Sequence, residues 1–373
     1  MGVGIVLPAW IAFHVGGSGL VGIVLLSSSV AGLVLAPIAG PLVDRHDRGT
    51  ITIVGQVTRA LGLVLLAPIE FVAEPLSPVL LIVSSILGAF GFAILSGSLS
   101  GILQAIVPEE QRMAFTVQRS LFNQLGIGIG TGVAGFAIDQ IGSSISALVF
   151  AAATLACLPA LKTIMAQVLD VRKPQRLSLL PASRQAISYL LASHQALSAA
   201  TSVALAFAVV QITNLLLPGF VINALGGDSK LFGLMEMAAA IAGMGALAVA
   251  GLPSVSNWLH RLTLPILGTA GIVLLLLALT TNSTIAVILY CVAGVLWNVS
   301  RAAANGHLLT VVDQSMIGRV QAFTTLLTSG FGLLIYVLPI TAPEASEASL
   351  YMACGVTIVI CVCVLAFWAE RKN

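Results

Sequence analysis

Charged residues are scarce in this chain. Lys and Arg number 16, Asp and Glu number 14, and together they make up 8% of 373 residues with a net charge of +2. Soluble globular domains carry roughly 25% charged residues, so this composition excludes an ordinary water-soluble domain. The small, scattered positive charge also gives no reason to expect a nucleic-acid partner.

Cysteines are few, and their spacing fits neither a disulfide framework nor a zinc site. The sequence also lacks His-Glu-x-x-His, Gly-x-Ser-x-Gly and Gly-x-x-x-x-Gly-Lys-Ser/Thr. We therefore expect no enzyme, no ATP-driven motor, no cofactor and no metal. All five cysteines fall within apolar runs, where we interpret them as packing residues: Cys157, Cys291, Cys354, Cys361 and Cys363.

Long apolar runs are what the chain does have, with 58% hydrophobic residues and a mean hydropathy of +1.07. A bilayer core needs about 20 helical residues to cross it. The sequence therefore predicts an all-α membrane protein of about twelve transmembrane helices. The expected segments are 2–15, 20–43, 51–69, 77–106, 113–138, 144–165, 195–224, 230–252, 262–281, 284–308, 316–340 and 348–369.

The first of these runs is short. About 13 apolar residues before Gly16 would span only about 20 Å as a helix. We expect helix 1 to be truncated by the choice of start site, with a half-inserted helix as the alternative. A signal peptide is disfavoured because there is no basic region before the run and no small-residue cleavage site after it.

Orientation follows from the basic residues, because Lys and Arg in short loops stay on the cytoplasmic side. The opposite loops are acidic or Gly-rich, with Glu70, Asp228, Glu344 and Glu347 and the single cation Lys230. An even number of spans with both termini in the cytoplasm is predicted. The basic positions on the expected cytoplasmic side are Arg45, Arg48, Arg112, Arg172, Lys173, Arg176, Arg184, Arg261, Arg319, Arg371 and Lys372.

Two bundles of six helices are expected, over residues 1–165 and 194–373, with a cytoplasmic linker at 166–193. The linker is polar from Asp170 to Arg176, and its second part has apolar residues at helical spacing that suit the membrane surface. The sequences around Arg112 in the first half and Arg319 in the second half are weakly similar. Duplicated halves are typical of membrane transporters.

The stretch from Gly40 to Arg48 reads Gly-Pro-Leu-Val-Asp-Arg-His-Asp-Arg. It resembles the loop motif between the second and third helices of the major facilitator superfamily, in the Asp-Arg-x-Asp-Arg form of the drug:proton antiporter-3 branch of macrolide and enterobactin exporters. Arg59, the segment 107–112 and the stretch from Arg184 to Gly227 are similar to that branch. The resemblance implies a monomer in the bacterial cytoplasmic membrane, with a small-molecule substrate, protons and membrane lipids as partners.

This motif makes physical sense as a latch. Gly40 allows helix 2 to approach a neighbour closely, Asp44 can meet the positive end of another helix, and Arg45 and Arg48 hold the aqueous side. The resemblance implies that the latch joins the halves on the cytoplasmic face and stabilises the outward-open state; the alternative is that these charges only set topology. The candidate gating residues are Gly40, Asp44, Arg45, Arg48, Arg112, Gly318 and Arg319.

Helix 5 contains a run of small residues from Gly126 to Gly135. This run resembles the antiporter motif of exporters, but Thr131 stands where the motif has Pro and Ala134 where it has Gly. Such residues also allow close helix packing in lipid. Close packing therefore stays open as an alternative to an exporter role.

Ionisable residues within apolar helices are costly and mark functional sites. Arg59, Arg119 and Arg301 outnumber the single acid Glu236, which favours an anionic or polar substrate; the alternative is that each Arg reaches the headgroups or pairs with a loop acid. Glu236 is the best candidate for proton coupling, or a structural hydrogen-bonding group. The remaining cavity or coupling candidates are His14, Asn123, Gln124, Gln211, Asn214 and Asn298, the last one turn from Arg301.

The predicted function is secondary active transport by alternating access, with proton-coupled efflux of a drug-like or siderophore-like molecule. A channel is disfavoured because repeated halves and a gated loop are typical of rocking bundles. Uptake, or lipid flipping by the same fold, remains the alternative.

Overall fold

The computed structural model describes residues 2–45, 48–106, 112–165, 188–190, 193–313 and 316–370. Side chains of the stretches 36–45, 99–106, 112–121 and 317–319 and of Arg48 are not among those described. The regular structure in these ranges is helical throughout. The chain divides into two compact units, residues 1–175 and 176–373, and this boundary falls inside the expected linker 166–193.

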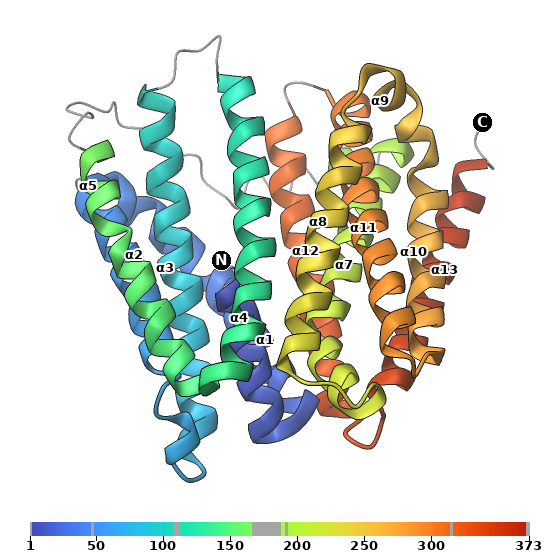
Figure 1. Ribbon diagram of the computed structural model, residues 1–373. Coiled ribbons are helices and arrows are strands. Elements are labelled where there is room, and N and C mark those ends of the chain that lie inside the picture. Colours follow the sequence, from blue (N-terminus) through green and yellow to red (C-terminus); the bar gives the residue numbers. More distant parts are fainter. Residues whose placement is uncertain are drawn as a thin grey trace. The chain divides into compact units, whose positions relative to one another are not determined.

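The first unit is a bundle in which α3 packs against both α1 and α2, and α4 packs against the same two helices (Figure 1). The short α5 lies on α2. Its helices are α1 (Val3–Arg45), α2 (Arg48–Val64), the 3-10 turn η1 (Ile69–Phe71), α3 (Leu76–Ile106), α4 (Arg112–Ala156) and α5 (Leu158–Met165).

The two longest helices of this unit, α1 and α4, are interrupted at glycine. Gly17 in α1 has φ +63° and Gly142 in α4 has φ +77°, a region that glycine enters without the steric cost of a side chain. The expected separation of 2–15 from 20–43 therefore coincides with a break in α1. The expected separation of 113–138 from 144–165 coincides with the break at Gly142, where Ser143 and Ser144 both donate hydrogen bonds to Glu70.

Polar side chains tie the helices of the first unit together. Thr52 of α2 donates to Ser98 of α3 at 2.8 Å, and Ser84 of α3 donates to the Gly62 carbonyl at 2.7 Å. Such interhelical hydrogen bonds matter in lipid because an unpaired polar group finds no water there.

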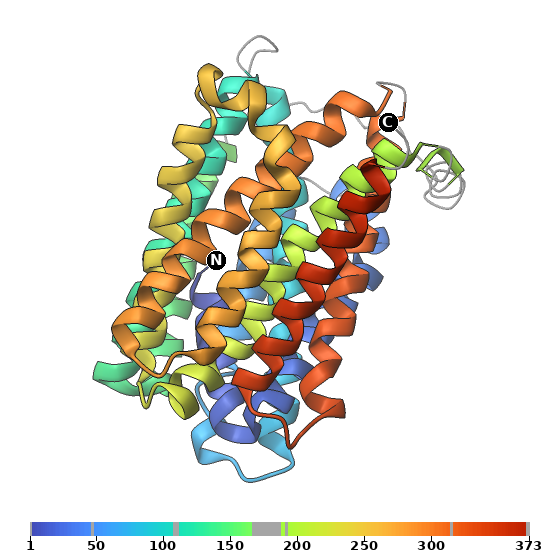
Figure 2. The same ribbon diagram turned by 90° about the vertical axis from the view of Figure 1, so that its right-hand side faces the viewer.

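The second unit is built around α7, in which most residues are buried. Contacts of α7 extend to α10, α11, α12 and α13, and Figure 2 shows α13 running beside α7 and α10. In the same unit, α8 packs closely against α11. The helices are α7 (His194–Gly219), α8 (Ser229–Ala250), α9 (Pro253–Leu259), α10 (Thr263–Leu279), α11 (Ser283–Val311), α12 (Ile317–Thr341) and α13 (Glu347–Glu370).

Three of these helices begin at a side-chain cap. Ser193, Asp228 and Asn282 each accept a hydrogen bond from a backbone N–H in the first turn of α7, α8 and α11. A capping oxygen satisfies a donor that the helix cannot pair internally. These helices accordingly begin within one residue of the starts predicted from the sequence.

Only the end of the expected linker is described, and it packs onto the second unit. Leu190 is 1% exposed and belongs to an apolar cluster with Ala196, Leu308 and Val320. The Tyr189 hydroxyl donates to the Asp313 carboxylate and accepts from the Asp313 backbone N–H, both at 3.1 Å. The segment 166–187 lies outside the described residues.

Nine helices in the described ranges are long and apolar enough to cross a membrane, and Thr263–Leu279 is a shorter apolar helix. The chain is therefore a multi-pass helical membrane protein. The count of twelve spans and the cytoplasmic placement of both termini stay predictions.

Candidate functional site

The candidate latch lies on helices whose relevant side chains are outside the described residues. Helix α1 carries Gly40, Asp44 and Arg45, and α2 begins at Arg48. Helix α4 begins at Arg112 and also carries Arg119, whereas Gly318 and Arg319 lie in the first turn of α12. The contacts of these side chains, and hence the gating role, stay predictions.

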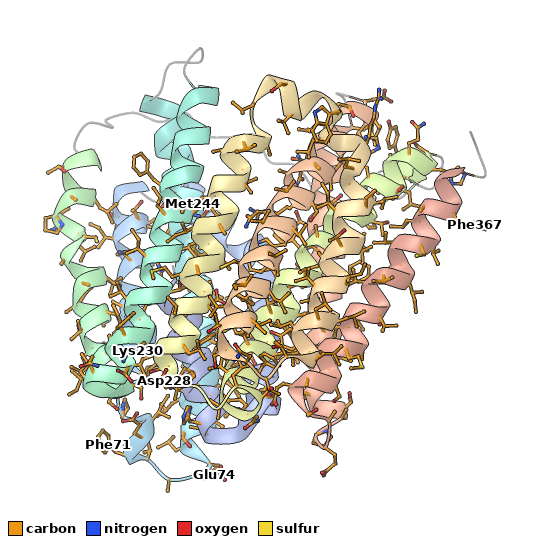
Figure 3. The ribbon with its side chains drawn as sticks, turned by 45° about the vertical axis from the view of Figure 1, so that its right-hand side comes forward. Phe71, Glu74, Asp228, Lys230, Met244 and Phe367 are labelled. Carbon is orange, nitrogen blue, oxygen red and sulfur yellow. The ribbon has the colours of Figure 1, made fainter. Side chains whose placement is uncertain are left out.

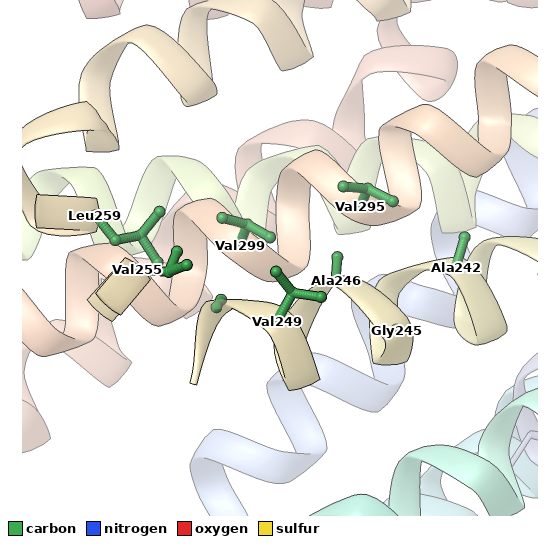
Figure 4. A pocket seen from close by; sticks show the side chains of 9 residues that line it. Ala242, Gly245, Ala246, Val249, Val255, Leu259, Val295 and Val299 are labelled. Atoms are coloured by element: carbon green, nitrogen blue, oxygen red, sulfur yellow. The ribbon is translucent and has the colours of Figure 1, made fainter. Parts of the chain in front are cut away.

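A surface groove of about 400 Å³ in the second unit is lined by aliphatic side chains and glycine. It is lined by α8, α9 and α11, including Val249, Val255 and Val299 (Figure 4). Its lining includes none of the candidate residues. None of these lining side chains could bind a polar substrate through a hydrogen bond or carry a proton.

An acid–phenol pair joins α8 to α11. Glu236 and Tyr290 are each the eighth residue of their helix, so both lie about 10 Å from the helix start at about 1.5 Å per residue. The Tyr290 hydroxyl donates to the Glu236 carboxylate at 2.6 Å. The expected acid of helix 8 is therefore held by a neighbouring helix two turns inside the bundle.

The surroundings of this pair are hydroxyl groups and aromatic rings. Tyr290 is fully buried and packs edge-on to Trp297, with ring centroids 5.9 Å apart. Thr213 of α7 lies beside the Tyr290 hydroxyl. Tyr351 of α13 is also fully buried, and its hydroxyl has no hydrogen-bond partner among the described residues. Within the same part of the chain, no cation is paired with Glu236.

The polar end of the unit lies just beyond this pair. Asn223 donates to Glu347, the first residue of α13, at 3.1 Å. Figure 3 shows Asp228 and Lys230 at this end of α8, with Met244 further along the helix. The Glu236 carboxyl therefore lies about two helical turns from the polar end of the unit at which α8 begins.

A second polar group surrounds Arg301 in the middle of the unit. Its Nη2 donates to the Asn298 side-chain oxygen at 3.2 Å. Its guanidinium carbon lies 5.4 Å from the centroid of the Phe207 ring, within the range of a cation–π contact. Phe207 is near the midpoint of α7, the helix that spans His194–Gly219.

Asn298 is fixed by its own contacts. Its side-chain N–H donates to the Gly294 carbonyl at 2.9 Å, and the residue is 3% exposed. Gly243 of α8 leaves the space that this amide fills, because a Cβ there would overlap it. The acceptor offered to Arg301 is therefore held in place by two helices.

Arg59 has a similar arrangement in the first unit. It donates to the Gln56 side-chain oxygen at 3.3 Å, and Gln56 in turn donates to the Thr154 carbonyl at 2.9 Å. Arg59, like Arg301, is half-buried and has a neutral amide for a partner.

The other candidates are distributed over both units. Gln211 of α7 donates to the Thr328 carbonyl at 3.4 Å, and its side-chain oxygen has no partner in the described residues. His14 is exposed, with Nδ1 3.0 Å from the Trp10 carbonyl oxygen. A cavity shared by α4 and α7 stays a prediction. Of its expected lining, Asn123 is exposed and Gln124 and Asn214 are half-buried.

Sequence reasoning missed the tyrosines and Phe207, because an aromatic residue in an apolar run reads as core packing. Equal spacing from the starts of two helices, with Glu236 in one and Tyr290 in the other, indicates that the two residues lie at a similar depth, but it does not show that the two helices are neighbours.

Two units of apolar helices with a few polar groups inside them are the geometry of a multi-pass membrane protein. The family model of the Major Facilitator Superfamily matches residues 1–337. The chain belongs to this superfamily.

A solved structure described as a bacterial homologue of the iron transporter ferroportin in the inward-facing state has the same fold. Its TM-score is 0.69 and its sequence identity 16%, over 97% of this chain and 96% of that one. No curated protein matches this sequence. Within the described residues, no group of three or more His, Cys, Asp and Glu side chains gathers as metal ligands would.

Proposed function

We propose that this chain is a proton-coupled exporter of a small organic molecule in the bacterial cytoplasmic membrane. The superfamily supports alternating access, in which two bundles rock about a central site. The resemblance of Gly40 to Arg48 to the loop motif of a drug:proton antiporter branch supports proton-coupled efflux.

The observation that carries the coupling proposal is the contact between Glu236 and Tyr290. A carboxylate away from water is costly unless it is paired or hydrogen-bonded. Here one phenol donates to it and no described cation neutralises it. Glu236 is half-buried, and we propose that alternating access changes how far water reaches its carboxyl and hence whether it holds a proton.

The test is accumulation in bacterial cells that express the chain, compared with cells that carry an empty vector. Radiolabelled erythromycin and 2,3-dihydroxybenzoylserine serve as probes, one a macrolide and the other a catechol carboxylate. Expressing cells should accumulate less of at least one probe, and a protonophore should abolish the difference. Higher accumulation on expression would contradict the proposal and favour uptake. Efflux that is unchanged by the protonophore would contradict proton coupling. Movement of a fluorescent phospholipid alone would favour lipid flipping.

Replacement of the acid tests its role within the same assay. Glu236→Gln keeps the size of the side chain and one acceptor oxygen for the Tyr290 hydroxyl but removes its titration. We expect protonophore-sensitive efflux to fall to the level of the empty vector. Glu344→Gln is the matched control, because Glu344 is an exposed acid of the same unit. Unchanged efflux by the Glu236→Gln variant would remove Glu236 from the coupling role.

A further inference from the structure

Arg301 lies deep within its helix. Along the axis of α11, Arg301 lies about 27 Å from the first residue, Ser283, and about 15 Å from the last residue, Val311, at about 1.5 Å per residue. A hydrocarbon core of about 30 Å fits within a helix of this length. The end of α11 nearer to Arg301 is therefore its C-terminal end, at Val311.

The guanidinium points away from that nearer end. It donates to Asn298, which lies one turn back toward Ser283, and it covers the ring of Phe207 near the middle of α7. An arginine that reached the headgroups would extend in the other direction. The contacts of Arg301 therefore hold its positive charge inside the bundle.

Nothing in the described residues neutralises this charge. The partners of Arg301 are an amide oxygen and an aromatic face, and no carboxylate pairs with it. A guanidinium has five N–H donors arranged to bind a carboxylate or phosphate through two parallel hydrogen bonds. Only one of these N–H groups donates to a described residue, and Arg301 is half-buried, so the remaining donors can take a further partner.

We infer that Arg301 is the anion-recognition residue of the substrate site, and that it binds a carboxylate or other oxyanion group of a soluble organic substrate. Asn298 positions the guanidinium, and Phe207 supports its face. The inference rests on the proposed function for one point, that the bound anion is the transported molecule.

The experiment measures equilibrium binding without a proton gradient, so its outcome is separate from that of the efflux assay. The purified chain is placed in phosphatidylcholine nanodiscs and its thermal unfolding is followed with benzoate, salicylate or inorganic phosphate. Benzamide and salicylamide are the neutral counterparts. At least one anion should stabilise the protein saturably, and the amides should not.

Substitutions locate the site. Arg301→Gln should weaken binding of that anion about 10- to 100-fold, the loss expected for a hydrogen-bonded charge pair. The anion affinity of Arg301→Lys should lie between those of the unchanged chain and Arg301→Gln, because lysine keeps the charge without the planar, two-pronged guanidinium. Arg261→Gln is the control, since Arg261 is exposed in the turn before α10, and it should bind as the unchanged chain does.

Stability without any anion separates recognition from a structural role. Removing an unpaired charge from the interior should leave the unfolding temperature of Arg301→Gln unchanged or higher. A lower unfolding temperature with unchanged anion affinity would overturn the inference, as would a panel in which no anion binds. Stabilisation by phosphatidylglycerol in the nanodisc, with none by the soluble anions, would assign Arg301 to lipid headgroups and also overturn it.

Discussion

At the scale of single residues, the second unit holds two ionisable groups with different kinds of partner. Glu236 accepts from a phenol, whereas Arg301 donates to an amide and faces a ring. Tyr290 and Arg301 are separated along α11 by about 16 Å at about 1.5 Å per residue. In our proposal, proton exchange at Glu236 and anion recognition at Arg301 therefore occupy separate levels of one bundle.

Tyr290→Phe tests whether the phenol supports the acid. The variant removes the donor to Glu236 while it keeps the ring that packs on Trp297. We expect proton-driven efflux to fall about tenfold, in line with the loss of one hydrogen bond to a charged group.

Tyr351→Phe is the matched control for this change. Tyr351 is as buried as Tyr290, but its hydroxyl has no partner in the described part of the chain. Its efflux should stay near that of the unchanged protein. An equal loss in both variants would show that the contact with Glu236 is not what matters.

At the scale of helices, the sequence predicted most boundaries because apolar runs and caps determine them. Asp228 and Asn282 cap α8 and α11 within one residue of the predicted starts. The sequence could not predict which helices pair, because pairing depends on rotation about each helix axis. The sequence therefore identified Glu236 as a candidate coupling residue from its charge alone. Tyr290 became a candidate only through its hydrogen bond to Glu236 in the structure.

Close packing of α8 on α11 confines the Asn298 amide whose oxygen accepts from Arg301. A Gly243→Ala change would place a methyl group on the Asn298 amide. Overpacking of this kind costs about 1–3 kcal/mol, so the unfolding temperature and anion affinity should both fall.

Gly245→Ala, two residues along the same helix, supplies the comparison. A Cβ at Gly245 meets nothing within 4 Å. Alanine also favours helix over glycine, so this variant should be as stable as the unchanged chain or more so. If the two alanine variants behave alike, the proposed spacing role of Gly243 is wrong.

The candidate latch is tested by a change that removes one charge. Asp44→Asn should leave membrane insertion and yield intact, because it does not lower hydrophobicity, but it should reduce transport in vesicles. Glu74→Gln is the control, since Glu74 is an exposed loop acid of the same unit. Transport by Asp44→Asn at the full rate would leave the motif with a topological role alone.

At the scale of the whole molecule, composition determined the class and the superfamily match agrees with it. A charged fraction of 8% excluded a soluble domain, and the family model covers residues 1–337. Substrate and direction of transport do not follow from the fold, because superfolds serve many functions through a few site residues. Arg301 and Glu236 are the residues on which these properties depend in our account.

Proton movement linked to substrate movement is the central claim. Inverted membrane vesicles acidified inside by respiration, with lumenal pH reported by acridine orange, measure it directly with the probe that cells export. Addition of that probe should make the lumen more alkaline in vesicles with the unchanged chain, but not in vesicles with Glu236→Gln. Accumulation of the probe without a change in lumenal pH, or the same change in both preparations, would contradict the account.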